Sequence, residues 1–256
     1  MNAPRSAASC LCTMLTWDSE FFGRTIARFE GACYTPEDAD ATRRFCAEHG
    51  VDCVYILLDA TDRVSIAAAQ EIGATFVDVR MTLETPQAST SDAQGSELPG
   101  EIRPATEDDL PAMRRLAATC HRHSRFYADA RFDADRVDLL YQTWIEKSCC
   151  GDADAVFVID AAGEAVGYVT CHLEHGGTGQ IGLIAVRPDL RGHGVGLRLL
   201  RAAGCWFNGA GCRSWRVATQ ASNVPALRVY QSYGLRTVAV QVWLHLWPAE
   251  TPRGRL

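Results

Sequence analysis

The sequence lacks the long apolar runs of membrane proteins and the leader of exported ones. No stretch approaches the roughly 18 consecutive apolar residues that a membrane-spanning helix needs, and the first residues, MNAPRSAASC, hold no continuous apolar core. An excess of basic residues is missing too, since 25 Lys and Arg face 31 Asp and Glu for a net charge of −6. We therefore expect a cytoplasmic protein that binds neither membranes nor nucleic acid.

Ligand sets for a metal ion and an even set of disulfide partners are also lacking. The 11 cysteines are odd in number and irregularly spaced, so we expect reduced thiols, most of them small core residues. Two clusters come closest to a metal site: Cys10 with Cys12, and Cys120 with His121 and His123. Neither has a second ligand pair at zinc-site spacing, and we predict no metal.

Apolar material is present in the amount that folded globular proteins use. The chain has 256 residues, of which 47% are hydrophobic and 22% charged, a length that corresponds to roughly one and a half to two domains. Residues 85–101 collect Pro, Ser, Gly and acidic side chains between two strongly patterned regions. We predict an N-terminal domain over residues 1–85, a linker over 86–101 and a second domain over 102–256.

The N-terminal region predicts a small α/β domain. Its expected elements are a strand over 24–30, a helix over 35–50, a buried strand over 51–59, a helix that ends near Gly73 and a strand over 74–84. In the last strand apolar and polar residues alternate, which places Asp78 on a polar face.

The second region also predicts mixed α/β structure. Thr106 and Asp109 have the spacing of a capping box at the start of a helix, and a second apolar stripe follows at Val137, Leu140 and Trp144. The remaining elements are expected as a three-strand antiparallel meander over 155–186, a glycine loop, a helix from about Val195, a strand over 214–220, a helix over 223–233 and a strand through Leu246.

The glycine loop has the composition of an anion site. Residues 186–196 read VRPDLRGHGVG, with three alternating glycines between a buried strand and a helix. Glycines permit close backbone approach, and the amides and positive dipole end of the helix favour a phosphate or diphosphate. A tight turn with no ligand is the alternative. The loop is neither a Walker loop nor a dinucleotide-binding fingerprint, because no Lys-Ser or Lys-Thr follows it and antiparallel strands precede it.

Two motifs resemble the acetyl-CoA-dependent N-acetyltransferases of the GNAT superfamily. Arg191, Gly194 and Gly196 match that family's loop signature, and Asn223 and Tyr230 match a second element one helix later. The resemblance implies a GNAT fold whose mixed sheet is splayed at its centre. Similar runs at 70–81 (QEIGATFVDVRM) and 231–242 (QSYGLRTVAVQV) favour a smaller, partly GNAT-like α/β domain in front of it.

Four further segments are similar to one group within that superfamily, the dTDP-fucosamine acetyltransferases. They are LTWDSEFFG from Leu15, SRFY from Ser124, YQTWIE from Tyr141 and RVATQASNVPAL from Arg216. The resemblance implies acetyl transfer from acetyl-CoA to the 4-amino group of a dTDP-linked 4-amino-4,6-dideoxyhexose. Rival acceptors are another nucleotide amino sugar, an aminoglycoside, a polyamine or a protein N-terminus, and the remaining alternative is a non-catalytic acyl-CoA-binding module.

The chemistry of acyl transfer assigns the candidate residues. By resemblance, Tyr230 protonates the departing thiolate, whereas a core tyrosine is the plain alternative. Asp78 is a candidate general base, a backbone N–H between Leu183 and Val186 is the candidate for the oxyanion, and a homodimer is expected from the exposed sheet edges. The candidate donor contacts are Ile184, Ala185, Val186, Arg191, Gly192, His193, Gly194, Val195, Gly196 and Asn223, and the candidate acceptor contacts are Arg125, Tyr127 and Trp17.

Overall fold

The computed structural model describes residues 11–86 and 102–248, which form two compact units. Unit 1 holds the described residues up to Arg80 and those from Val240 onward, and unit 2 runs from Met81 to Ala239. The boundaries fall inside two strands, β4 (Thr75–Glu84) and β10 (Arg236–Leu246), so each strand contributes to both units. This division differs from the expected one, which placed everything after residue 101 in the second domain. The expected linker lies almost wholly outside the described residues.

Unit 1 is a small α/β unit in which helices pack on strands. Its strand order is β1-β2-β3-β10, with β2 and β3 parallel and the outer pairs antiparallel. Thr35 begins helix α2, as the sequence predicts. It forms a capping box there, because its hydroxyl accepts from the Asp38 N–H and its N–H donates to the Asp38 carboxylate. The elements before β4 are β1 (Cys12–Met14), α1 (Thr16–Phe22), β2 (Ile26–Phe29), α2 (Pro36–His49), β3 (Cys53–Asp59) and α3 (Arg63–Glu71).

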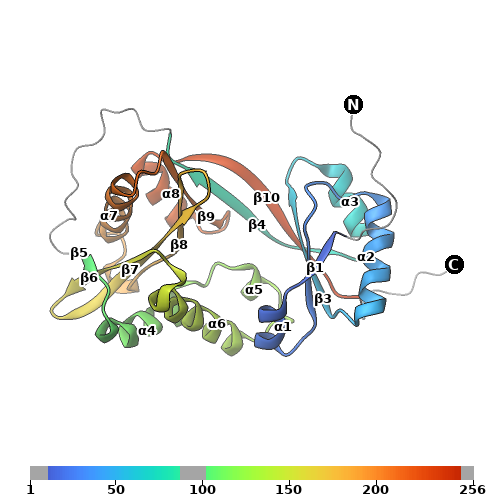
Figure 1. The fold of residues 1–256 in the computed structure, drawn as a ribbon, viewed down its shortest axis with the longest axis horizontal. Helices are drawn as coiled ribbons and strands as arrows, with labels where there is room; N and C mark the ends of the chain where they lie inside the picture. The colour runs from blue at the N-terminus through green and yellow to red at the C-terminus, as the bar shows by residue number, and fades with distance from the viewer. Residues whose placement is uncertain (1–10, 87–101, 249–256) are drawn as a thin grey trace. The chain divides into compact units, whose positions relative to one another are not determined.

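Unit 2 is a sheet covered by helices on both faces (Figure 1). Helices α7 and α8 pack on one face, and α4 and α6 lie on the other. Its strand order is β4-β9-β8-β7-β6-β5, in which β6, β7 and β8 form the predicted antiparallel meander and β8 pairs with β9 in parallel. The elements are β5 (Ile102–Pro104), α4 (Leu110–Cys120), α5 (Arg125–Ala128), α6 (Ala134–Lys147), β6 (Ala155–Ala161), β7 (Glu164–Glu174), β8 (Thr178–Val186), α7 (Val195–Gly209), β9 (Ser214–Gln220) and α8 (Val224–Tyr233).

In the core of unit 2, one phenylalanine of α7 packs directly on the sheet. Phe207 of α7 is fully buried, and its ring stacks on Trp215 of β9 with the centroids 5.6 Å apart. A Cβ on Gly179 of β8 would come within 2.3 Å of the Phe207 ring, so this glycine lets the ring lie directly on the strand. Phe207 therefore packs against β8 and β9 at the end where the two strands are paired.

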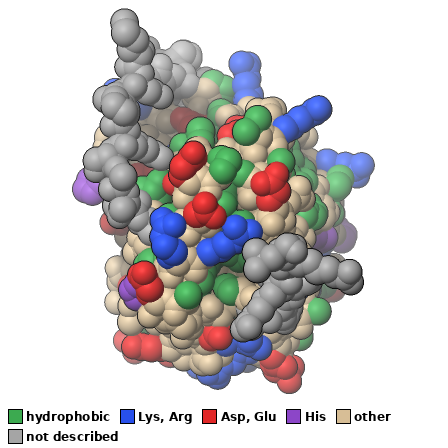
Figure 2. All heavy atoms as spheres, turned by 90° about the vertical axis from the view of Figure 1, so that its right-hand side faces the viewer, with side chains coloured by type: hydrophobic (Ala, Val, Ile, Leu, Met, Phe, Trp, Pro, Cys, Tyr) green, Lys and Arg blue, Asp and Glu red, His purple; other side chains and the backbone are tan. Residues whose placement is uncertain are grey.

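The surface agrees with the charge balance of the sequence. Acidic and basic side chains lie intermixed on the face shown in Figure 2, and unit 1 carries exposed pairs of opposite sign such as Arg28 with Glu30 and Arg43 with Asp40. Among the residues described here, no helix has the length and apolar character needed to cross a membrane.

Candidate functional site

Strands β8 and β9 part halfway along their length. Their parallel register runs from Thr178 opposite Ser214 to Ile181 opposite Val217 and stops there, although β8 continues to Val186 and β9 to Gln220. The central splay implied by the resemblance is thus present. Beyond Ile181, β8 turns a main-chain edge toward the gap between the two strands.

A β-bulge sets which peptide groups occupy that edge. The β7–β8 register moves from Cys171 opposite Ile181 to Val169 opposite Ile184, so two β8 residues face the single Thr170. Farther along, the Arg187 N–H donates to the Val166 carbonyl. In an antiparallel ladder bonded and non-bonded pairs alternate, which turns the peptide groups of Ala185 toward β7 and those of Ile184 and Val186 toward the gap.

Two predicted oxyanion donors are thereby occupied. The Leu183 N–H donates to the Thr170 hydroxyl at 2.8 Å, and Ala185 stands in a bonded pair with Tyr168. The Val186 carbonyl accepts from the Arg191 Nε at 3.3 Å and from the Cys120 thiol at 3.5 Å. Of the four residues proposed from sequence, Ile184 is the one whose peptide group faces the gap in the middle of the segment.

The glycine loop joins this strand to the first turn of α7. Gly192 and Gly194 have φ of 81° and 77°, which side chains with a Cβ adopt at a cost, and Gly194 ends the loop as the N-cap of α7 without any side-chain cap. Because Gly194 has no side chain, the N-cap residue does not occupy the amides that begin at Val195. Gly196 lies inside the helix, where a Cβ would make an ordinary contact of 3.6 Å with Val229.

His193 and Arg191 of the loop are exposed. The His193 ring nitrogen Nδ1 lies 3.0 Å from the Arg191 carbonyl, within the loop itself.

Tyr230 is the buried tyrosine of α8. It is 4% exposed and belongs to the apolar cluster of unit 2 together with Val195 and Leu199 of α7 and Val217 of β9. Burial raises the pKa of its phenol, and no hydrogen bond to its hydroxyl is present among the described residues. The alternative of a core tyrosine bonded to a carbonyl has no support in this geometry.

Asn223 serves as the N-cap of α8 rather than as a residue inside it. Its Oδ1 accepts from the Ala226 N–H at 3.3 Å, and its Nδ2 donates to the Thr219 hydroxyl at 3.1 Å. The side chain thus ties the end of β9 to the helix that carries Tyr230. Both bonds are made within the protein, and a contact between Asn223 and acetyl-CoA stays a prediction.

Asp78 and Trp17 belong to unit 1, and the other candidates belong to unit 2. Asp78 is half-buried on β4, and its Oδ1 accepts from the Val79 N–H at 2.7 Å. Trp17 of α1 is also half-buried, and its ring stacks on Phe21 with the centroids 5.1 Å apart.

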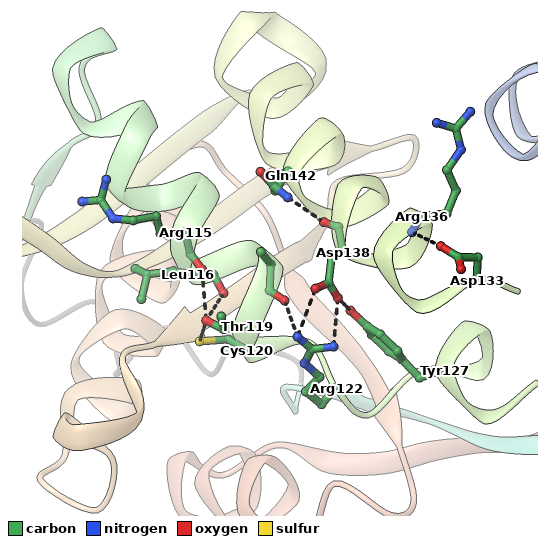
Figure 3. Close-up of polar contacts among 11 residues, drawn as sticks. Arg115, Leu116, Thr119, Cys120, Arg122, Tyr127, Asp133, Arg136, Asp138 and Gln142 are labelled. Carbon is green, nitrogen blue, oxygen red and sulfur yellow. Dashed lines mark hydrogen bonds and ion pairs between the residues drawn. The ribbon is translucent and has the colours of Figure 1, made fainter. Parts of the chain in front are cut away.

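The predicted acceptor contacts on α5 are engaged with their neighbours. Figure 3 shows the Tyr127 hydroxyl donating to Asp138, which also binds the Arg122 guanidinium. The Arg122 guanidinium lies 4.9 Å from the centroid of the Tyr127 ring, and that of Arg125 lies 4.1 Å from the Phe126 ring. Burial, and then Asp138, raise the pKa of Tyr127. This network fixes the α5 segment against α6.

His121, which the sequence grouped with Cys120 and His123 as a weak metal-site candidate, contacts two tyrosines. Its Nε2 lies 2.8 Å from the Tyr168 hydroxyl, and its ring stacks on Tyr141 at 4.7 Å. Within the described ranges no three His, Cys, Asp or Glu side chains form a metal-binding group, and Cys10 of the other suggested cluster lies outside those ranges.

We expect the stability of the protein to fall between pH 6.5 and pH 4 because of His121. Burial, with a smaller contribution from Arg191, lowers the pKa of His121 from 6.5 to about 4. The unfolded chain therefore takes up a proton at a higher pH than the folded one, so the free energy of unfolding decreases as the pH drops through this window. The full shift corresponds to about 3 kcal/mol, and because the residue is partly exposed we expect about 1–2 kcal/mol.

Urea unfolding at pH 7, 5.5 and 4.5 measures this effect. His121→Asn should flatten the pH dependence, whereas the exposed His49→Asn should leave it as in the wild type. If the free energy of unfolding depends on pH as strongly in His121→Asn as in the wild type, His121 is not the cause of the pH dependence. The Asp109 carboxyl does not confuse the result, because Arg103 lowers its pKa to about 2, below this window.

Comparisons with known proteins agree with the geometry. The profile of the Acetyltransferase (GNAT) family matches residues 110–235. The "dTDP-fucosamine acetyltransferase" of Escherichia coli O6:H1 is 30% identical over 237 residues, which are 90% of this chain and 96% of that protein. The "Spore coat polysaccharide biosynthesis protein SpsD" of Bacillus subtilis is 26% identical over 59% of this chain and 52% of its own length. Among solved structures, a GCN5-related N-acetyltransferase from Sphaerobacter thermophilus has a TM-score of 0.62 at 17% identity, covering 96% of this chain and 78% of its own.

Proposed function

Because this chain belongs to the GNAT family of acetyltransferases, we propose that it moves an acetyl group from acetyl-CoA to the 4-amino group of a dTDP-linked 4-amino-4,6-dideoxyhexose. Family membership makes it an acetyl-CoA-dependent N-acetyltransferase. The sugar-nucleotide acceptor, with the galacto configuration favoured, is supported by the E. coli relative, which this chain covers almost end to end.

The donor side of the proposal is carried by the open edge of β8. The Ile184 peptide groups and the Val186 N–H, which face the gap, suit a pantetheine arm and a thioester carbonyl. The uncapped start of α7 after Gly192 and Gly194 suits the diphosphate of the coenzyme. The remaining proposed contacts with acetyl-CoA lie on four segments. They are Ala185 of β8, Arg191 and His193 of the glycine loop, Val195 and Gly196 at the start of α7, and Asn223 at the start of α8.

The proposed reaction is a direct attack within a ternary complex. The amine nitrogen bonds to the thioester carbon, the Ile184 N–H stabilises the oxygen as it gains negative charge, and the carbon–sulfur bond breaks. The departing thiolate receives the Tyr230 proton, and the nitrogen gives up one proton to a base. Tyr230 is suited to its part because burial keeps its phenol protonated at neutral pH and no side chain competes for its hydroxyl among the described residues.

Asp78 is the proposed base. As a general base it takes the proton of the attacking amine, so Asp78→Asn should lower kcat/KM at neutral pH by about 10²-fold and change the pH profile of kcat/KM. The measurement is kcat/KM from pH 5 to 9. Asp40→Asn, which removes an exposed unit 1 carboxylate paired with Arg43, is the matched control. An Asp78→Asn profile that overlays the wild type excludes Asp78 and leaves a water chain as the route for the proton.

The acceptor contacts are proposed on two elements. Arg125 is suited to the diphosphate, because guanidinium pairs with phosphate oxygens through two bonds. Tyr127 and Trp17 offer ring faces for a base or a sugar, since the Tyr127 hydroxyl is already bonded to Asp138. The further parts of the proposal are a cytoplasmic location, pairing as a homodimer and the absence of a metal requirement.

A panel of amines tests the proposed acceptor. The protein is incubated with acetyl-CoA and, separately, a dTDP-4-amino-4,6-dideoxygalactose, its gluco epimer, a UDP amino sugar, an aminoglycoside, spermidine and a peptide with a free N-terminus. Release of free thiol and acetylated product by mass spectrometry are followed together. We expect the highest kcat/KM with a dTDP sugar. Turnover confined to the other amines overturns the acceptor, and no turnover with any amine, combined with tight coenzyme binding by calorimetry, favours an acyl-CoA-binding module.

A further inference from the structure

The bulge in β8 depends on one side chain from the neighbouring strand. Thr170 of β7 is fully buried, and its hydroxyl accepts the Leu183 N–H at 2.8 Å. A bulge leaves the extra residue without a partner in the ladder, and a buried N–H without a partner is costly. Thr170 supplies that partner, since its hydroxyl accepts the Leu183 N–H at the point where the register shifts.

A second side chain fixes the direction of the Thr170 hydroxyl. The His172 Nε2 lies 3.4 Å from the Thr170 Oγ1, and the His172 Nδ1 lies 3.1 Å from the Asp152 carbonyl. A carbonyl only accepts, so in the neutral ring Nδ1 donates to Asp152 and Nε2 accepts the Thr170 proton. The chain of bonds therefore runs from Leu183 through Thr170 and His172 to Asp152, with each hydrogen pointing the same way.

The space around this chain is closed on the β8 side by a glycine. A Cβ on Gly182 would lie 2.4 Å from the His172 Nε2 and 2.8 Å from the Thr170 Oγ1. Gly182 is thus the residue that lets the two side chains reach the bulged strand. Strand, hydroxyl and imidazole fit together only with glycine at this point.

We propose that Thr170 is a positioning residue for acetyl transfer: by holding Leu183 at the bulge, it turns the Ile184 N–H toward the gap where the thioester carbonyl binds. Without the bulge, the β8 register would move by one residue, and the peptide groups of Leu183 and Ala185 would face the gap instead. This inference rests on the role assigned to the Ile184 N–H in the proposed function. It does not depend on the identity of the acceptor.

Thr170→Val tests the proposal because it keeps the shape and removes the hydroxyl. We expect kcat to fall about 10-fold while KM for acetyl-CoA changes less than 3-fold, since the contact strengthens as the oxygen gains charge. Thr170→Ser restores the hydroxyl and should stay within about 2-fold of the wild type. Thr42→Val, which removes a buried hydroxyl from unit 1, controls for a general loss of stability and should leave kcat unchanged.

Amide hydrogen exchange gives a readout that needs no acceptor. The Leu183 amide should exchange faster in Thr170→Val than in the wild type or in Thr170→Ser. If Thr170→Val does not fold, Gly182→Ala applies the same test from the opposite strand and should lower kcat similarly. The proposal is overturned if the folded variant keeps wild-type kcat, if Ser fails to restore it, or if Leu183 exchange is unchanged.

The kinetic test uses whichever amine the wild-type enzyme acetylates in the panel. Failure of the dTDP sugars with success of another amine therefore removes the proposed acceptor and leaves the Thr170 experiment intact. Conversely, full activity of Thr170→Val toward a dTDP sugar overturns the positioning role and leaves the proposed function standing.

Discussion

We expect Tyr230→Phe to lower kcat on the order of 10²- to 10³-fold, with little change in KM for acetyl-CoA. The substitution removes only the hydroxyl, which is buried, stays protonated and has no hydrogen-bond partner among the described residues. Without it the thiolate loses the proton donor that we propose for it as the carbon–sulfur bond breaks, whereas we expect acetyl-CoA binding to be unchanged. Steady-state thiol release at saturating acetyl-CoA measures the effect.

Tyr233→Phe is the matched control. Tyr233 lies on the same helix, is half-buried, and burial also raises its pKa. Removal of its hydroxyl should change kcat less than about 2-fold, because its ring makes an edge contact with Trp215 and the proposed reaction gives it no part. Wild-type turnover by Tyr230→Phe, at unchanged thermal stability, rules out Tyr230 as the proton donor.

We expect Phe207→Ala to lower the free energy of unfolding by about 3–5 kcal/mol. Phe207 is fully buried between α7 and the paired ends of β8 and β9; its ring stacks on Trp215 and makes an edge contact with Trp206. Its removal leaves a cavity that surrounding rings fill only in part. The urea midpoint should fall with the slope unchanged, which is the signature of lost stability in a two-state transition.

A double-mutant cycle with Gly179 tests the cause. In the wild type, Gly179→Ala brings a Cβ within 2.3 Å of the Phe207 ring and should cost about 1–3 kcal/mol. In the Phe207→Ala background the same change should be close to neutral, because the ring it strikes has gone. Additive losses would mean that the two sites are independent and that the cavity is not the cause.

Local signals in the sequence predicted much of the fold. The capping pair Thr35 and Asp38 begins a helix where expected, β9 alternates in burial along its whole length, and Gly194 precedes the first turn of α7. Each of these features depends on neighbours within a few residues. The same holds for Tyr230, which lies on the predicted helix, whereas Asn223, predicted inside that helix, is its N-cap.

Features set by distant partners were not predicted. The bulge in β8 involves a hydrogen bond between Thr170 and Leu183, which are 13 residues apart in the sequence. The hydrogen bond between His121 and Tyr168 joins residues 47 positions apart. One signal was available: a threonine inside the apolar run of residues 165–171 needs a partner for its hydroxyl. The division of β4 and β10 between two units also has no local signature, since each strand reads as one continuous alternation.

The parting of β8 from β9 has a consequence for how such enzymes diverge. Every amino acid except proline supplies a main-chain N–H, so the side chains at Ile184 and Val186 can change while the peptide groups that we propose for the acyl group stay in place. This agrees with a shared architecture at 17% identity to the Sphaerobacter protein. Alanine scanning along this strand would therefore understate its importance, and replacement of the single Ile184 amide by an ester would reveal it.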